Sequence, residues 1–134
     1  MTGVWMIRGI GTDIVDVARM RRAVGRWGDR FLKKVFTDGE IAHCIKRKDP
    51  FPSLAVRFAA KEAFIKAFST EVGRRMLPVS VLRDIEVINA TSGKPSLLVH
   101  GRLSASCSGM AIHLTLAHET TYAVATVVLE KKEE

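Results

Sequence analysis

The segment that most constrains the fold is a stretch in the middle of the chain made mainly of alanine, phenylalanine and charged residues. Residues 54–68 read LAVRFAAKEAFIKAF and contain neither glycine nor proline, while two prolines stand just before them. Such a run of good helix formers predicts a helix from Leu54 to about Phe68, with Ser53 as its N-cap.

The elements before this helix are predicted to be one strand and two helices. Residues 4–10 read as a strand, and the glycines at positions 9 and 11 allow tight packing or unusual backbone angles at its end. A second helix is predicted from its apolar spacing of three and four residues, although two glycines weaken it: Val17, Met20, Val24, Trp27 and Phe31. Thr37 and Glu40 stand at capping-box spacing and predict a short third helix.

The elements after it are predicted to be mostly strands. Residues 81–90 and 95–100 read as strands joined by a tight turn, and residues 112–118 and 122–129 read as a hairpin. A short helix is expected near residues 103–107. The order of strand, helices and then mostly strands favours an α+β fold with a mainly antiparallel sheet packed against the long helix. We expect one domain over residues 1–134, with residues 130–134 as a solvated tail.

Charge is distributed unevenly along the chain. Residues 1–75 hold 16 lysines and arginines against 8 acids, whereas residues 76–134 hold 5 against 6. A basic first half indicates a polyanionic partner, such as nucleic acid, a phosphorylated cofactor or an acidic protein. No apolar run is long enough to cross a bilayer, so we expect a cytoplasmic protein without a membrane partner. Cys44 and Cys107 stand alone and predict neither a zinc site nor a disulfide.

Two carboxylates are candidates for metal binding, and each has a simpler interpretation. Asp13 follows the first strand, where it could cap the next helix or hold a hard cation such as Mg²⁺. Asp16 fits a first-turn acid that complements the helix dipole. Glu62 could form an ordinary surface pair with Lys66, yet most of its helical neighbours are apolar, so its carboxylate needs a cation or several donors.

Cations accompany both carboxylates. The central helix carries Arg57, Lys61 and Lys66, which could form a phosphate-binding surface beside a metal or could simply be solvated. The preceding helix carries a stripe without an intervening acid, within an arc of about 80° if the helix is continuous. This stripe is typical of a docking ridge for an acidic partner: Arg19, Arg22, Arg26, Arg30 and Lys33.

Together these segments resemble the holo-acyl-carrier-protein synthase family, the short trimeric group of 4'-phosphopantetheinyl transferases. The matching stretches occur in the family's order and span residues 7–129. They are GIGTDIV at residues 9–15, FTDGE at 36–40, RFAAKEAFIKAF at 57–68, SGKP at 92–95 and LTLAHE at 114–119.

The resemblance implies the phosphopantetheinyl transferase fold, an Mg²⁺ held by Asp13 and Glu62, and coenzyme A as the substrate. Lys66 would serve catalysis with those two acids, and Arg57, Lys61 and Lys66 would lie near coenzyme A phosphates. The 3'-phosphoadenosine end would be lined by Ser92, Gly93, Lys94 and His118.

The resemblance also implies the reaction and the partners. The phosphopantetheine arm would pass to a serine of an acyl carrier protein in support of fatty acid biosynthesis. The active sites would form between subunits of a homotrimer, and Arg19, Arg22, Arg26 and Arg30 would meet the acidic carrier. Where the family usually has Phe-Gly-Thr-Gly after the long helix, this chain has FSTEVG at residues 68–73. A noncatalytic trimeric scaffold and a basic nucleic-acid-binding domain are the alternatives, and we expect no nucleic-acid partner.

Overall fold

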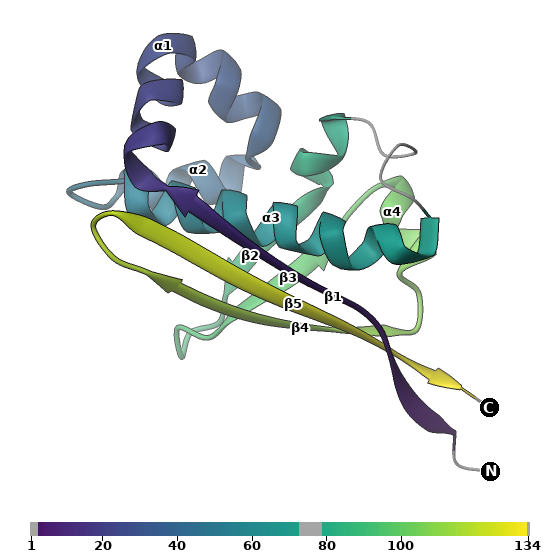
Figure 1. Cartoon of the computed structure of the whole chain (residues 1–134). Coiled ribbons are helices and arrows are strands. Elements are labelled where there is room, and N and C mark those ends of the chain that lie inside the picture. The colour runs from purple at the N-terminus through teal and green to yellow at the C-terminus, as the bar shows by residue number, and fades with distance from the viewer. Residues whose placement is uncertain (1–2, 73–78, 134) are drawn as a thin grey trace.

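The fold is an antiparallel sheet with a long helix laid across one face. The structure, a computed structural model, describes residues 3–72 and 79–133. The strands β1 (Val4–Asp16), β5 (Tyr122–Glu133) and β4 (Met110–His118) form the sheet in that order, and α3 (Phe51–Val72) crosses it (Figure 1). A second, two-stranded antiparallel sheet consists of β2 (Ile85–Asn89) and β3 (Pro95–Val99). The predicted α+β fold is confirmed.

Two glycines let α3 lie directly on β1. A Cβ atom at Gly9 would overlap the carbonyl oxygen of Ala67, and one at Gly11 would overlap that of Ala63. Both helix residues are fully buried alanines, so neither partner has a side chain that separates the backbones. The prediction of tight packing at these glycines is confirmed, and its consequence is that the backbones of β1 and α3 are in contact.

The first strand is longer than predicted. It continues through the predicted helix cap to Asp16, because every residue from Gly9 to Asp16 pairs with a residue of β5. The N-cap of α1 (Val17–Val35) is Asp16, whose Oδ1 accepts from the amide of Ala18 at 2.9 Å. The interpretations of Asp13 as the cap and of Asp16 as a first-turn acid are therefore wrong.

The helix α1 is bent at Gly28. This glycine has φ 59° and ψ −144°, outside the helical region, and the two halves of α1 run in different directions (Figure 1). Only glycine adopts such a conformation without strain. The short helix α2 (Asp38–Ile45) follows, and its Thr37–Glu40 capping box is present as predicted.

The central helix is longer than predicted at both ends. It begins at Phe51, whose amide donates to Oδ1 of Asp49 at 3.1 Å, so Ser53 is not the cap but a buried residue inside the helix. It continues to Val72, so the segment that departs from the family pattern is helical up to that residue. The 3-10 helix η2 (Val79–Asp84) occupies part of a predicted strand, and α4 (Arg102–Ser106) is near its predicted position.

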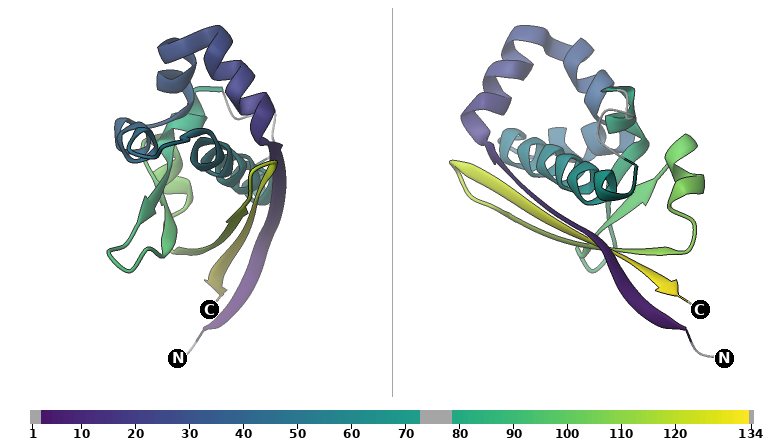
Figure 2. Two further views of the ribbon diagram at one scale, coloured as in Figure 1. Left: turned by 90° about the vertical axis from the view of Figure 1, so that its left-hand side faces the viewer. Right: turned by 45° about the vertical axis from the view of Figure 1, so that its right-hand side comes forward.

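Within the described residues, one face of the three-stranded sheet carries no helix. The helices gather on the other face (Figure 2). Because Gly9 and Gly11 face α3, the alternate residues Ile10 and Ile14 point to the open face, where they are 59% and 63% exposed. They stand opposite Val128 and Val124 of β5. The open face therefore carries paired apolar residues.

The chain ends differ from the predicted tail. Glu130–Glu133 belong to β5 and pair with Val4–Ile7 at the start of β1, although residues 131–133 are exposed. Cys44 is buried and Cys107 partly buried, and both are free thiols. Within residues 3–72 and 79–133, no helix has the length and apolar character of a membrane span.

Candidate functional site

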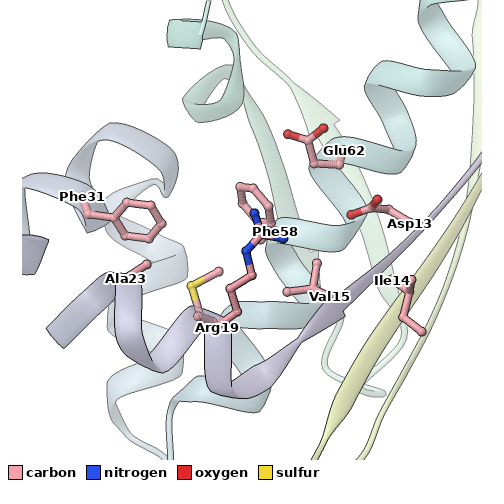
Figure 3. Close-up of a pocket in the computed structure, with 9 residues that line it drawn as sticks. Asp13, Ile14, Val15, Arg19, Ala23, Phe31, Phe58 and Glu62 are labelled. Carbon is pink, nitrogen blue, oxygen red and sulfur yellow. The ribbon is translucent and has the colours of Figure 1, made fainter. Parts of the chain in front are cut away.

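The two predicted metal ligands face one pocket. A pocket of about 380 Å³ is bounded by the end of β1, the start of α1 and the middle of α3. Figure 3 shows the carboxylates of Asp13 and Glu62 turned toward the same space, with Arg19 reaching in from α1. Its other wall is apolar and consists of Val15, Met20, Ala23, Phe31 and Phe58. A charged end and an apolar wall thus share one opening.

Strand alternation explains why Asp13 faces this pocket. It follows Gly9 and Gly11 at steps of two, so its side chain points to the face of β1 that carries α3. The close packing at those two glycines brings the middle of α3, and with it Glu62, next to the same strand. The carboxylates come together although they are 49 positions apart in the sequence.

Lys66 lies beside Asp13. Its Nζ donates to Oδ1 of Asp13 at 2.9 Å and to the carbonyl oxygen of Thr12 at 2.9 Å. The lysine side chain is 46% exposed and the aspartate side chain 19% exposed, so the pair borders solvent. Lys66 therefore lies beside the pocket, through its contact with Asp13.

The donor set fits a hard divalent cation. Within the described part of the chain no group of three or more histidine, cysteine or acidic side chains could hold a metal. Two converging carboxylates are what Mg²⁺ commonly takes from a protein, because water and substrate phosphate oxygens complete its shell. Asp13 and Glu62 would hold such an ion.

Lys61 is not in the pocket, which corrects its assignment to coenzyme A phosphates. Its side chain is fully buried, with Nζ 2.7 Å from Oε1 of Glu40. The ammonium also donates to the carbonyl oxygens of Leu82, at 2.8 Å, and Ile85. Its three protons are thus taken by protein acceptors. Burial lowers the pKa of Lys61, while the carboxylate of Glu40 acts in the opposite direction.

The partner Glu40 extends this buried contact to other elements. Its Oε1 accepts from the amide of Thr37 at 3.0 Å and its Oε2 from the amide of Val87 at 2.9 Å. The Lys61–Glu40 pair therefore joins α3, α2, η2 and β2. A charge pair with all its partners inside the protein is structural.

Arg57 lies on another side of α3 from Glu62 and is also buried. It donates to Oγ of Ser53 at 2.6 Å and to Oδ1 of Asn89 at 2.8 Å, while its Nε is buried without a hydrogen-bond partner in the described structure. The side-chain Nδ2 of Asn89 in turn donates to the carbonyl oxygen of Gly93 at 3.2 Å. Arg57 is thus connected to the 92–94 turn through Asn89.

The other predicted cofactor residues lie in two places, which are the turn between β2 and β3 and a second pocket. Gly93 has φ 90° in the exposed turn between β2 and β3, where Oγ of Ser92 accepts from the amide of Lys94 at 3.4 Å. His118 lines a second pocket of about 290 Å³ together with Arg47 and Ser53. None of the described residues that line this pocket also lines the pocket of Asp13.

Three cations act on His43 near the second pocket, while Asp49 and Glu119 line that pocket together with Arg47. Burial, followed by the charges of Arg57, Arg47 and Lys46, lowers the pKa of His43. Sequence reasoning did not include Arg47, Ser53 or Asn89 in the site. Only the tertiary structure identifies these three residues, because each is an ordinary polar residue in its local sequence.

The arginine ridge of α1 is not continuous, because the bend at Gly28 divides it. Arg19, Arg22 and Arg26 precede the bend, and Arg30 and Lys33 follow it. Arg19 lines the pocket of Asp13 and Glu62, and Arg26 lies over the ring of Trp27 with Cζ 5.0 Å from its centroid. The prediction of a single arc is wrong, since it assumed an unbroken helix.

Comparisons with known proteins agree on one family. Residues 9–127 match the 4'-phosphopantetheinyl transferase superfamily. The holo-[acyl-carrier-protein] synthase of Chlamydia muridarum is 43% identical over 122 residues, which are 91% of this chain and 94% of that protein. The corresponding protein of Halothermothrix orenii is 43% identical over 129 residues, which are 94% of this chain and 99% of its own.

Solved structures show the same fold. The holo-[acyl-carrier-protein] synthase of Neisseria meningitidis aligns with a TM-score of 0.81 and 33% identity over 94% of this chain and 100% of its own. A Bacillus anthracis holo-(acyl-carrier-protein) synthase, solved in complex with CoA (3',5'-ADP), aligns with a TM-score of 0.75 and 34% identity over 94% of this chain and 98% of its own.

Proposed function

The chain belongs to the 4'-phosphopantetheinyl transferase superfamily, and we propose that it carries out the reaction of the holo-acyl-carrier-protein synthases within it. It transfers the 4'-phosphopantetheine arm of coenzyme A to a serine of an apo acyl carrier protein, with adenosine 3',5'-bisphosphate as the second product. The observation that supports this reaction best is that Asp13 and Glu62 face one pocket beside Lys66 and Arg19.

The chemistry is a displacement at phosphorus. The serine oxygen of the carrier forms a bond to the β-phosphorus of coenzyme A, the bond from that phosphorus to the bridging oxygen breaks, and the bisphosphate leaves. Asp13 and Glu62 would hold Mg²⁺, which would supply neutralising charge to the diphosphate. Lys66 and Arg19 add positive charge at the same place. Glu62 can accept the serine proton directly or through water.

We place the 3'-phosphoadenosine end of coenzyme A at the second pocket and the 92–94 turn. Arg57, Ser92, Gly93, Lys94 and His118 stay in the proposal, with Arg47 added. Arg47 and His118 line the second pocket, and Arg57 contacts Ser53 of that lining and, through Asn89, the 92–94 turn. Lys61 is left out because its ammonium group is already saturated.

We propose that the enzyme works as a homotrimer with active sites between subunits. The support is the open face of the sheet, where the exposed Ile10 and Ile14 stand beside partly buried cross-strand valines, as at surfaces that another protein covers. Size-exclusion chromatography with light scattering should give three times the chain mass of 14.8 kDa. Ile10→Lys should dissociate the trimer and abolish transfer, whereas an active monomer would contradict shared sites.

The carrier is proposed to dock on α1. Arg22 and Arg26 lie before the bend and Arg30 after it, so charge reversal on either half tests which one contacts the acidic carrier. Reversal on the half that contacts the carrier should raise the KM for the carrier severalfold and leave the KM for coenzyme A unchanged, because charge at an interface acts on association. The nucleic-acid alternative predicts instead a salt-dependent mobility shift with DNA.

The direct test is to incubate the protein with an apo acyl carrier protein, coenzyme A and Mg²⁺. Mass spectrometry should show a gain of about 340 Da on the carrier, the mass of the transferred arm. Removing the metal with EDTA should stop the gain, and adding Mg²⁺ should restore it. No gain with any carrier would favour the scaffold alternative. The cytoplasmic location and the role in fatty acid biosynthesis remain predictions of the family resemblance.

A further inference from the structure

The contact between Lys66 and Asp13 occupies a carboxylate that the proposed reaction needs for a metal. The Nζ atom of Lys66 lies 2.9 Å from Oδ1 of Asp13, and Asp13 lines the same pocket as Glu62. The ammonium group thus lies beside a carboxylate oxygen that would face a divalent ion. A bound cation and this ammonium group would repel each other at such a separation.

We propose that Lys66 acts as an internal counter-ion: it holds Asp13 in the free enzyme and moves to the diphosphate of coenzyme A when the substrate binds. The inference rests on the proposed function and adds a coupling to it. Divalent cation and coenzyme A would bind cooperatively, because the diphosphate removes a competing charge from Asp13 at the moment it supplies ligands for the metal.

The environment of Lys66 suits such an exchange. Its side chain is 46% exposed, and its second acceptor is the carbonyl oxygen of Thr12 in a partly solvated strand. A lysine has a flexible stem of four carbons and no fixed donor direction, so its ammonium group can turn to a nearby phosphate at small cost. A doubly charged diphosphate attracts it more strongly than one carboxylate.

The coupling between the divalent cation and coenzyme A is reciprocal and can be measured from either ligand. If coenzyme A raises the affinity for the divalent cation, the cation raises the affinity for coenzyme A by the same factor. Part of that factor comes from phosphate oxygens that bind the metal, and part from the release of Asp13 by Lys66. A variant without the ammonium group loses only the second part.

The test is binding of Mn²⁺ to the substrate-free protein, measured by electron paramagnetic resonance of the unbound ion. Lys66→Met should bind Mn²⁺ about tenfold more tightly than the wild type, because a unit charge about 5 Å from a divalent ion opposes its binding by at least this factor even in water. With saturating coenzyme A the increase in Mn²⁺ affinity should be smaller in the variant than in the wild type. A lysine with a purely structural role would instead leave the affinity unchanged or weaken it.

Two matched variants separate the contact from net charge. Lys66→Arg keeps a cation beside Asp13 and should bind Mn²⁺ like the wild type. Arg19→Met removes one positive charge from the same pocket without removing the contact to Asp13, so it measures the part of the Lys66→Met effect that comes from net charge alone. Equal affinities of Lys66→Met and the wild type, or of Lys66→Met and Arg19→Met, would overturn the inference. Transfer by the wild type is measured separately, so failure of the proposed function would be recognised independently.

Discussion

Two lysine–carboxylate pairs on the same helix show how burial separates a structural role from a functional one. Lys61 and Glu40 are both fully buried at 2.7 Å, whereas Lys66 and Asp13 are 46% and 19% exposed at 2.9 Å. The distances are nearly equal, but the first ammonium group has two further carbonyl acceptors in the core and the second borders a pocket. The buried pair cannot exchange partners without leaving a desolvated charge.

The largest expected effect is a loss of transfer activity when a carboxylate of the pocket beside α3 is removed. Asp13→Ala and Glu62→Ala should each lower transfer by at least about a thousandfold, because each removes one of the two metal-holding carboxylates. Their urea unfolding midpoints should stay close to that of the wild type, since neither side chain belongs to the core. Turnover of either purified variant with Mg²⁺ at the wild-type rate would remove the metal assignment.

The buried pair should respond in the opposite way. Lys61→Met leaves the carboxylate of Glu40 buried without its cation and should destabilise the protein by about 3–5 kcal/mol. The double variant Lys61→Met with Glu40→Leu should recover part of that loss in urea denaturation, because no buried charge remains. If Lys61→Met unfolds at the wild-type urea concentration, the contrast between the two pairs does not hold.

The close contact between β1 and α3 affects both the stability of the protein and the geometry of the pocket. Gly11→Ala would place a Cβ against the carbonyl oxygen of Ala63 and should destabilise the protein by about 1–3 kcal/mol as the helix shifts. It should also lower transfer, because Asp13 and Glu62 reach the pocket from these two elements. Gly25→Ala is the control: a Cβ there meets no atom within 4 Å, so stability should not fall. Equal stability of both variants would show that the close approach is unimportant.

The smallest expected effect completes the comparison. Lys66→Met removes an ion pair at the protein surface and should change the free energy of unfolding by less than about 1 kcal/mol, since solvent screens such pairs. Lys61→Met should lower the free energy of unfolding several times more. Denaturation of both variants in one buffer measures the difference directly, and comparable losses would mean that the Lys66–Asp13 pair is as structural as the buried one.

Local patterns predicted most of the elements. The spacing of apolar and capping residues was sufficient for α3, for the capping box at Thr37 and for the β4–β5 hairpin. The ends of elements were less predictable: a strand continued through Thr12 and Asp13 because β5 pairs with it, and one glycine out of two, Gly28, bent α1. The local sequence does not show that a segment pairs with a distant strand. It also does not show which glycine adopts a non-helical backbone angle.

The sequence by itself determined the kinds of residue available for the chemistry, namely two acids and the cations that accompany them, and the family to which they belong. Tertiary structure decided which of these residues meet. On one helix it buried Lys61 against Glu40 and turned its neighbour Glu62 toward Asp13. The physical reason is that consecutive helical residues point about 100° apart, so only the packing around α3 determines which one faces the core and which one faces the pocket.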